Sequence, residues 1–259
     1  MKNGYPPRPD WADNFDWLKA VVFDLDGTLY SPSQVRNRVV RRAVAENWRH
    51  PGELVRIASV LRVYRKAQKQ LRNGEPSSDL EDALVQWTAS ETGSPAPMVR
   101  AIVHRWMEQE PLPVMFGSRR PGIDELLATL KNRGIKRAVL SDYPVVGRLE
   151  AMGLADWFDL AISSRDPEVQ RFKPHPLGLQ VALKRLGIAP DAALYIGDRP
   201  MVDAITAMRA GVRCVIVTPH TGPKTVRAPY WSTDFATLGD ALTGHAGEAL
   251  RSLPAGAGA

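Results

Sequence analysis

The pattern of hydrophobic and polar positions changes in character along this chain of 259 residues. An apolar run that begins at Val21 fits a buried parallel strand, and Gly27 permits the sharp exit that such a strand needs. Residues 31–115 then show apolar positions at the helical period, without an equally convincing strand. From Pro121 onward the pattern alternates between helices and strands, which is typical of a parallel sheet with right-handed crossovers. The sequence therefore predicts an α/β domain interrupted by a helical insertion.

Four more strands are predicted in the alternating part, at Ala138–Leu140, Phe158–Ile162, Ala193–Ile196 and Val212–Val217. A helix with an apolar stripe from Ile123 to Leu130 precedes the first of them. The later helices are predicted at Val145–Met152, Pro176–Leu186, Met201–Ala210 and Asp234–Leu253, the last one followed by a frayed tail.

Four helices are predicted in the insertion. The first two carry apolar stripes within Val35–Val44 and Leu54–Tyr64, and two more are expected at Ser78–Thr92 and Ala96–Glu110. The insertion also contains three tryptophans, for which packing between helices is favoured over stacking on a base or sugar: Trp48, Trp87 and Trp106.

Composition limits the partners. Lys and Arg number 34 against 28 acids, but these cations are spread over predicted helices, which favours solvated helix faces over a nucleic-acid surface. No apolar run is long enough for a membrane span, and the amino end lacks the apolar stretch of a signal peptide. The single cysteine, Cys214, lies in a predicted buried strand and suits a reducing compartment. We therefore expect a cytoplasmic protein without nucleic-acid or membrane partners; the oligomeric state is left open.

Asp24 and Asp26 stand at the carboxyl end of the first predicted strand. The period of two places both side chains on one side, at the sheet edge where open α/β sheets bind ligands. The alternative is an ordinary turn at Asp26 and a solvated strand end at Asp24. Three later segments favour the functional interpretation: Leu140-Ser141-Asp142, Phe172-Lys173-Pro174-His175-Pro176, and the segment from Tyr195 to Asp203.

In this order, the four segments resemble the four signatures of the haloacid dehalogenase-like (HAD) hydrolase superfamily, from about residue 20 through 217. The resemblance implies a Rossmann-like parallel sheet flanked by helices, with residues 1–30 and 116–259 forming the catalytic core. Residues 31–115 then resemble a helical C1 cap, inserted after the first strand and expected to close over the core.

The resemblance also implies roles for the acids. Asp24 would be the nucleophile, and Asp26 the general acid and base that protonates a leaving alcohol and activates water. Mg²⁺ would be held by Asp24, Asp198 and the backbone carbonyl of Asp26, because hard oxygen ligands suit this ion. Asp203 would support the site from outside the metal's own ligands. The alternative for Asp198 and Asp203 is helix capping and solvent exposure.

Phosphate binding is assigned by the same resemblance to Thr28, Ser141 and Lys173. A hydroxyl donates to an oxyanion without adding a charge, and a lysine offsets the charge of the transferring group; Ser141 as a helix cap and Lys173 as a surface residue are the alternatives. Asp142 departs from the asparagine frequent after the Ser141 position, so it would repel phosphate or engage a cationic group of the substrate.

Together these residues predict a Mg²⁺-dependent phosphatase that acts on a small phosphorylated metabolite through an aspartyl-phosphate. Asp26 favours this chemistry over dehalogenation, since a departing halide needs no proton. The alternatives are a phosphomutase of the same superfamily and a regulatory protein that binds phosphate ligands without turnover. Tyr30 is expected to guard the pocket, and Arg36 or Arg38 to attract a second anionic group.

Overall fold

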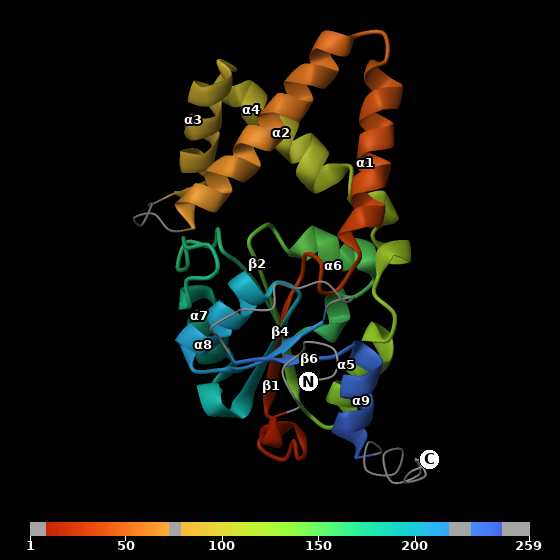
Figure 1. The fold of residues 1–259 in the computed structure, drawn as a ribbon, viewed down its shortest axis with the longest axis vertical. Helices are drawn as coiled ribbons and strands as arrows, with labels where there is room; N and C mark the ends of the chain where they lie inside the picture. The colour runs from red at the N-terminus through yellow and green to blue at the C-terminus, as the bar shows by residue number, and fades with distance from the viewer. Residues whose placement is uncertain (1–8, 73–78, 218–228, 245–259) are drawn as a thin grey trace, which may run out of the picture.

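The computed structural model describes residues 9–72, 79–217 and 229–244. In it, a sheet domain carries a helical insertion that projects beyond one end of the sheet (Figure 1). None of the helices within these ranges combines the length and the apolar character that a membrane crossing requires.

The sheet has six strands among the described residues, all parallel, in the order β3-β2-β1-β4-β5-β6. Their bounds are β1 (Ala20–Asp24), β2 (Lys136–Ser141), β3 (Leu160–Ser163), β4 (Ala193–Gly197), β5 (Arg213–Ile216) and β6 (Trp231–Ser232). The predicted parallel α/β fold is confirmed. The two-residue strand β6 was not predicted, because no apolar run in the sequence indicates it. Strand β1 lies in the centre and is buried along its whole length, so the ligand-binding edge after it is central too.

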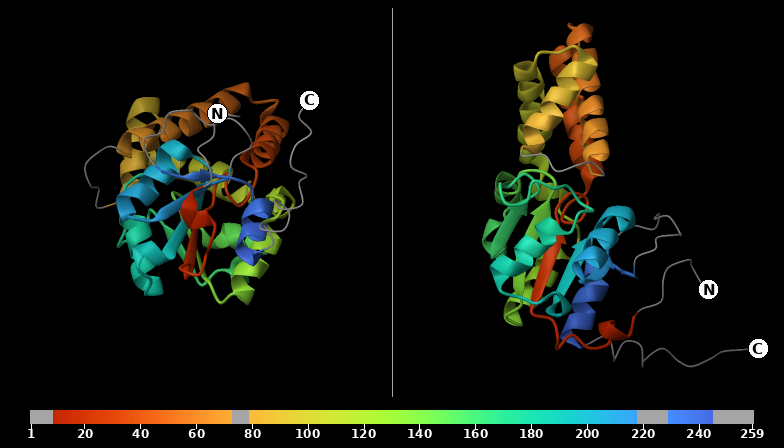
Figure 2. Two further views of the ribbon diagram at one scale, coloured as in Figure 1. Left: turned by 60° about the horizontal axis from the view of Figure 1, so that its bottom comes forward. Right: turned by 90° about the vertical axis from the view of Figure 1, so that its left-hand side faces the viewer.

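Helices cover both faces of the sheet (Figure 2). They are α5 (Ile123–Asn132), α6 (Val146–Met152), α7 (Leu177–Leu186), α8 (Ile205–Ala210) and α9 (Phe235–Thr243). Alternate residues of β1 point into the hydrophobic cores on opposite faces of the sheet. Phe23 packs in the core under α5, α6 and α9, whereas Val22 packs in the core under α7 and α8. The carboxyl-terminal helix was predicted to continue to Leu253; it ends at Thr243, and the last part of that prediction lies outside the described residues.

The insertion contains α1 (Pro32–Asn47), α2 (Pro51–Leu71), α3 (Leu80–Thr92), α4 (Ala96–Val103) and a π-helical turn, η2 (His104–Gln109). The predicted single helix over 96–110 is thus divided, as is the one over 201–210, where the π-helical turn η7 (Pro200–Ala204) precedes α8. The remaining short 3₁₀ turns are η1 (Asp10–Ala12), η3 (Leu112–Val114), η4 (Phe116–Ser118), η5 (Ala155–Trp157) and η6 (Pro190–Ala192).

Packing accounts for two of the three tryptophans of the insertion. Trp106 is 4% exposed and lies in a small core with Ala43 and Ile57, and Trp87 packs on the larger core around Tyr64. Trp48 differs from the prediction because it is 66% exposed, directly after the end of α1. Cys214 is buried in β5, as expected.

Candidate active site

Three buried or half-buried carboxylates meet at the carboxyl ends of β1 and β4. Asp24 ends β1, Asp198 follows β4, and Asp203 lies in η7. One oxygen from each lies within 4.8 Å of the others. The sequence analysis grouped these acids, and the structure brings them together.

Two glycines permit this close approach. Gly27 has a φ of +98°, and a Cβ there would overlap the carboxylate of Asp198. A Cβ on Gly197 would overlap the side chain of Asp203. The acid cluster therefore requires a glycine at both positions, one in the turn after β1 and one at the end of β4.

Lys173 is the cation at the centre of the cluster. Its Nζ donates to Asp24 Oδ1, to Asp203 Oδ1 at 2.9 Å and to the Tyr195 hydroxyl at 3.1 Å. An ammonium has three donors, so these partners use all of them. The side chain is 1% exposed. In this structure Lys173 therefore organises the acids, rather than presenting a free donor to a phosphate.

Burial and neighbouring charges set the protonation of the cluster. Burial raises the pKa of Asp24 to about 7, although the Lys173 ammonium opposes this shift. Burial, together with the Asp203 charge, raises the pKa of Asp198 to about 6. Burial also disfavours the charged form of Asp203, but Lys173 and Arg199 lower its pKa below the usual range. Lys173 and Arg199 therefore do not fully offset the cost of charging Asp24 and Asp198 in this buried site, and a bound cation would favour their ionised forms.

The donors present fit a hard divalent cation. Asp198 Oδ1 is buried and has no hydrogen-bond partner, and the nearest cation, Arg199 Nε, is 3.6 Å away. A buried carboxylate oxygen without a partner is rare unless an ion or water binds it. Carboxylate oxygens from Asp24, Asp198 and Asp203 are the ligand type that Mg²⁺ takes.

Asp26 lies beside the cluster in a separate network. Its carboxylate accepts hydrogen bonds from the Tyr30 hydroxyl, from Arg148 Nη1 and, at 3.0 Å, from Ser141 Oγ. Burial opposes its ionisation, but the Arg148 guanidinium and these hydrogen bonds lower the pKa of Asp26 below its usual value. The ionised form therefore predominates near neutral pH, and that form accepts a proton.

The two hydroxyls that were expected to bind phosphate contact these acids. Thr28 Oγ1 donates to Asp24 Oδ2 at 2.8 Å, and Ser141 Oγ donates to Asp26. Each hydroxyl thus fixes the orientation of a carboxylate whose role was inferred from the sequence.

Asp142 pairs with an arginine of this chain, an arrangement that the sequence did not predict. Arg72 of the insertion donates to Asp142 Oδ2 at 2.7 Å, and the Ser164 hydroxyl donates to Oδ1 at 3.0 Å. Its charge is therefore compensated across the contact between the insertion and the sheet domain.

The sequence analysis missed several site residues. Arg148 is 7% exposed and pairs with Asp26, but an arginine inside a helix gives no spacing signal. Tyr195 was interpreted only as strand core. Arg199 directly follows Asp198 and donates its backbone N–H to Asp203 Oδ2 at 2.9 Å, so its position beside a signature acid was a usable signal.

Two cavities adjoin Asp26. The smaller, of about 180 Å³, is lined by Asp24, Asp26 and Asp142, and by cations of α2. The larger, of about 320 Å³, lies between Asp26, Tyr30 and Arg148 on one side and α1, α2 and η2 on the other. Arg36 lines this larger cavity, as expected for one of the two arginines proposed; Arg38 is not among its lining residues.

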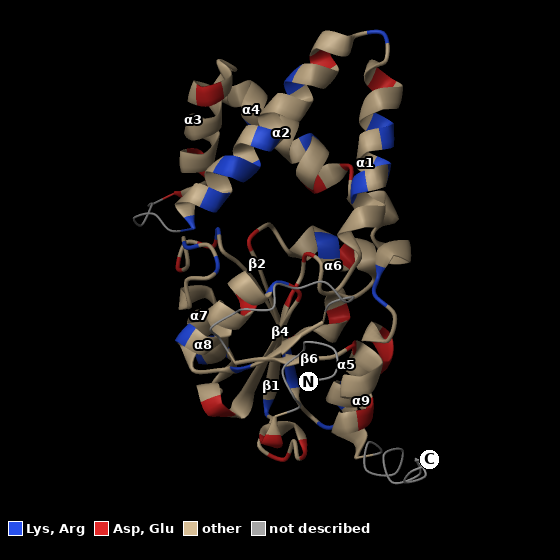
Figure 3. Cartoon of the chain, in the orientation of Figure 1, with Lys and Arg blue, Asp and Glu red and all other residues tan. Residues whose placement is uncertain are grey.

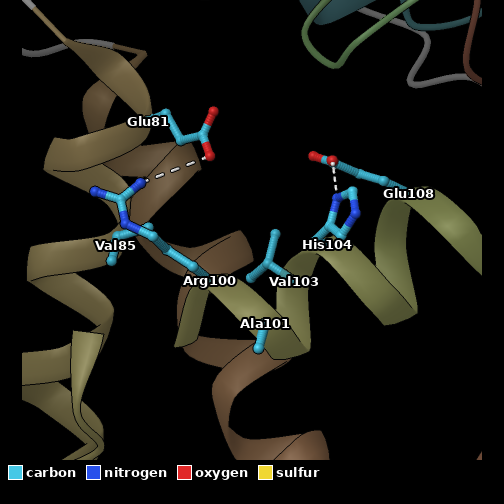
Figure 4. Close-up of a pocket in the computed structure, with 7 residues that line it drawn as sticks. All are labelled: Glu81, Val85, Arg100, Ala101, Val103, His104 and Glu108. Atoms are coloured by element: carbon cyan, nitrogen blue, oxygen red, sulfur yellow. Dashed lines mark hydrogen bonds and ion pairs between the residues drawn. The ribbon is translucent and has the colours of Figure 1, made fainter. Parts of the chain in front are cut away.

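A further cavity in the insertion differs in character (Figure 4). Its charged side chains satisfy one another: Arg100 pairs with Glu81 at 3.7 Å, and His104 Nδ1 contacts Glu108 Oε2 at 3.1 Å. The acid cluster is not part of this cavity, so we do not assign the chemistry to it.

Comparison with known proteins agrees with this geometry. A family model described as haloacid dehalogenase-like hydrolase matches residues 18–211. The phosphoglycolate phosphatase of Rhodospirillum rubrum is 32% identical over 230 residues, which cover 86% of this chain and 90% of that protein. The phosphoglycolate phosphatase of Cereibacter sphaeroides is 31% identical, covering 78% of this chain and 85% of its own.

Solved structures share the fold. CbbY from Rhodobacter sphaeroides, in complex with phosphate, has a TM-score of 0.58 and 24% identity, covering 87% of this chain and 99% of its own. L-2-haloacid dehalogenase from Xanthobacter autotrophicus has a TM-score of 0.58 and 21% identity, covering 92% of this chain and 100% of its own.

Proposed function

The chain belongs to the haloacid dehalogenase-like hydrolase family, and we propose that it is a Mg²⁺-dependent phosphatase that hydrolyses a small organic phosphate monoester through an aspartyl-phosphate. The observation that carries the proposal is the buried cluster of Asp24, Asp198 and Asp203, held by Lys173 beside Asp26. The names of the phosphoglycolate phosphatases support a phosphatase over a dehalogenase.

In the first step, a carboxylate oxygen of Asp24 attacks phosphorus, and the bond from phosphorus to the ester oxygen breaks. The electron pair leaves with the alcohol oxygen, which takes a proton from the protonated fraction of Asp26. The lowered pKa of Asp26 makes this fraction small near neutral pH and larger toward acid pH. Thr28 and Lys173 hold the two oxygens of Asp24, so the nucleophile is oriented before substrate arrives.

In the second step, water attacks the phosphorus of the aspartyl-phosphate while Asp26 takes a proton from that water. Inorganic phosphate leaves, and the Asp24 carboxylate is regenerated. The lowered pKa of Asp26 suits this proton acceptance. Arg148, Tyr30 and Ser141 keep the Asp26 carboxylate in place.

Asp24, Asp198 and the backbone carbonyl of Asp26 would hold Mg²⁺, with Asp203 positioned by Lys173 to support them. The ion supplies charge compensation between the Asp24 carboxylate and the phosphate oxygens. Residues 31–115 would act as the cap that covers this site, over a core of residues 1–30 and 116–259.

Phosphate release from a panel of phosphate monoesters tests the proposal. We expect turnover with Mg²⁺ and loss of turnover with a chelator. Asp24→Asn should abolish turnover because an amide is a poor nucleophile. Asp156→Asn, an exposed acid on the sheet domain, is the matched control. A folded protein that forms no phosphate from any ester in Mg²⁺ would contradict the proposal.

Phosphomutase activity remains the second candidate, because an aspartyl-phosphate can pass its phosphoryl group to another hydroxyl. Product analysis separates the two: inorganic phosphate indicates hydrolysis, and an isomeric phosphate ester indicates transfer.

A further inference from the structure

The larger cavity beside Asp26 has an apolar wall. Its volume is about 320 Å³, which equals the liquid volume of about ten water molecules. The wall contains Val39, Val40, Leu61, Trp106 and Met107 from the helical insertion. Apolar side chains around such a space favour an apolar part of a ligand over water alone.

The same cavity also holds cations without acidic partners. Arg36 and Arg65 line it, and within the described ranges neither forms an ion pair. Several other arginines of the insertion have acidic partners: Arg42 pairs with Glu46 at 2.6 Å and Arg100 with Asp82 at 2.5 Å. The remaining charges of the wall, Asp26 and Arg148, pair with each other. The cavity therefore carries net positive charge.

The larger cavity lies next to the smaller cavity that contains Asp24. Asp26, Arg65 and Tyr143 line both the larger cavity and the smaller one that contains Asp24. A phosphoryl group at Asp24 in the smaller cavity would therefore leave the rest of its ester facing the larger one, past Asp26. Most of the basic residues of α2 lie on the half of that helix nearer the sheet domain (Figure 3).

From these observations we propose that the larger cavity is a leaving-group subsite for phosphate esters whose alcohol has an extended apolar body and ends in a second anionic group. This inference rests on the proposed phosphatase function and names its substrate class. The apolar body contacts the wall, and Arg65 and Arg36 bind the terminal anion. A carboxylate and a second phosphate share this chemistry. Glycolate, the two-carbon alcohol of phosphoglycolate, would leave most of the larger cavity empty.

Binding of phosphonates tests the subsite without turnover. The series runs from phosphonoacetate to 6-phosphonohexanoate, with hexylphosphonate lacking the carboxylate and hexane-1,6-bisphosphonate carrying a second phosphonate. By titration calorimetry with Mg²⁺, we expect affinity to rise at least about tenfold along the carboxylate series because methylenes are buried. Hexylphosphonate should bind up to about fivefold more weakly than 6-phosphonohexanoate, because a partly exposed charge pair contributes modestly. The bisphosphonate, compared with 6-phosphonohexanoate, tells which anion is preferred.

Variants of the cavity's lining test which residues cause the carboxylate preference and the dependence on chain length. Arg65→Met should reduce the difference between 6-phosphonohexanoate and hexylphosphonate, and the double variant Arg36→Met/Arg65→Met should remove it, whereas Arg62→Met should keep it. Arg62 is a matched control because it is exposed on α2 and outside this cavity's lining. Val40→Phe, at a side chain that is 54% exposed, should weaken the long ligands more than phosphonoacetate by filling the cavity.

An affinity that does not rise with chain length, or a carboxylate preference that persists in full in the double variant Arg36→Met/Arg65→Met, would overturn the subsite. Phosphate release from the corresponding esters is recorded in parallel. Its absence would reject the phosphatase, whereas the calorimetry would still decide the subsite.

Discussion

Lys173 joins Asp24 and Asp203 into one buried unit. All three side chains are at most 1% exposed, and the ammonium contacts both carboxylates. Taking these charges out of water is costly unless each has a partner. The ammonium therefore opposes the protonation that burial favours. It lowers the pKa of Asp203 below the usual range and limits the rise in the pKa of Asp24.

Lys173→Met tests this coupling. We expect destabilisation of about 3 to 5 kcal/mol without added metal, because two carboxylates lose their shared cation in a buried site. Urea unfolding measures it, with the exposed Lys184→Met as control. Added Mg²⁺ should recover part of the loss. A midpoint equal to that of the parent would contradict the coupling.

Arg148 connects the Asp26 carboxylate to the insertion, since its Nη2 also donates to the backbone carbonyl of Met107 at 2.9 Å. Arg148→Met should lower kcat by up to about 100-fold, because a displaced acid–base group loses alignment with the reacting oxygen. Arg148→Lys should recover part of that kcat. If both variants change only KM, Arg148 does not position Asp26.

At the scale of elements, the loop after β1 carries the tightest constraint. Gly27 and Gly93 both have positive φ values, +98° and +65°, but only Gly27 lies against another side chain; no atom lies within 4 Å of a Cβ built at Gly93. Substitutions at these two glycines therefore distinguish two effects: the cost of placing a side chain at a positive φ, and the cost of filling the space that Asp198 occupies.

Gly93→Ala should cost about 1 to 2 kcal/mol of stability and leave kcat unchanged, because it places an alanine in the left-handed region. Gly27→Ala should lower stability and also abolish turnover, since the new methyl group displaces Asp198. Parallel measurements of thermal unfolding and phosphate release check both. Equal effects of the two substitutions on kcat would contradict the role given to Gly27.

The elements that could be predicted are those with long periodic patterns. The strand at Val21 and the helix from Ile123 were evident because buried faces repeat in the sequence. Strand β6 (Trp231–Ser232) is too short for a periodic signal, and its position depends on pairing with β5. The acids of the site could be found from their place after strands, whereas Arg148 and Arg65 reach it through tertiary packing that no local spacing encodes.

At the scale of the whole molecule, the insertion is attached to the sheet domain by polar contacts. Arg165, which follows β3, is 8% exposed; it contacts Glu108 at 3.1 Å and the Tyr64 hydroxyl at 3.0 Å. Gln170 Oε1 accepts from the backbone N–H of Leu80 at 2.7 Å. The Tyr143 hydroxyl donates to Gln68 at 2.6 Å. These contacts hold the insertion over Asp26.

Removing Arg165 should loosen this arrangement. For Arg165→Met we expect KM to rise about tenfold, because the cavities beside Asp26 depend on where the insertion sits, with a smaller change in kcat. Arg185→Met removes an exposed pair with Glu168 on the sheet domain and should leave KM unchanged. Steady-state phosphate release measures both. An unchanged KM in Arg165→Met would show that the contact is dispensable for substrate binding.

The account depends most on Asp24 receiving the phosphoryl group. During turnover with Mg²⁺, acid quenching followed by borohydride reduction converts an acyl phosphate on aspartate into homoserine, which peptide mass spectrometry locates. We predict homoserine at position 24, and none there when substrate is omitted. Continued phosphate release with Asp24 unmodified, or with the modification on another acid, would contradict the account.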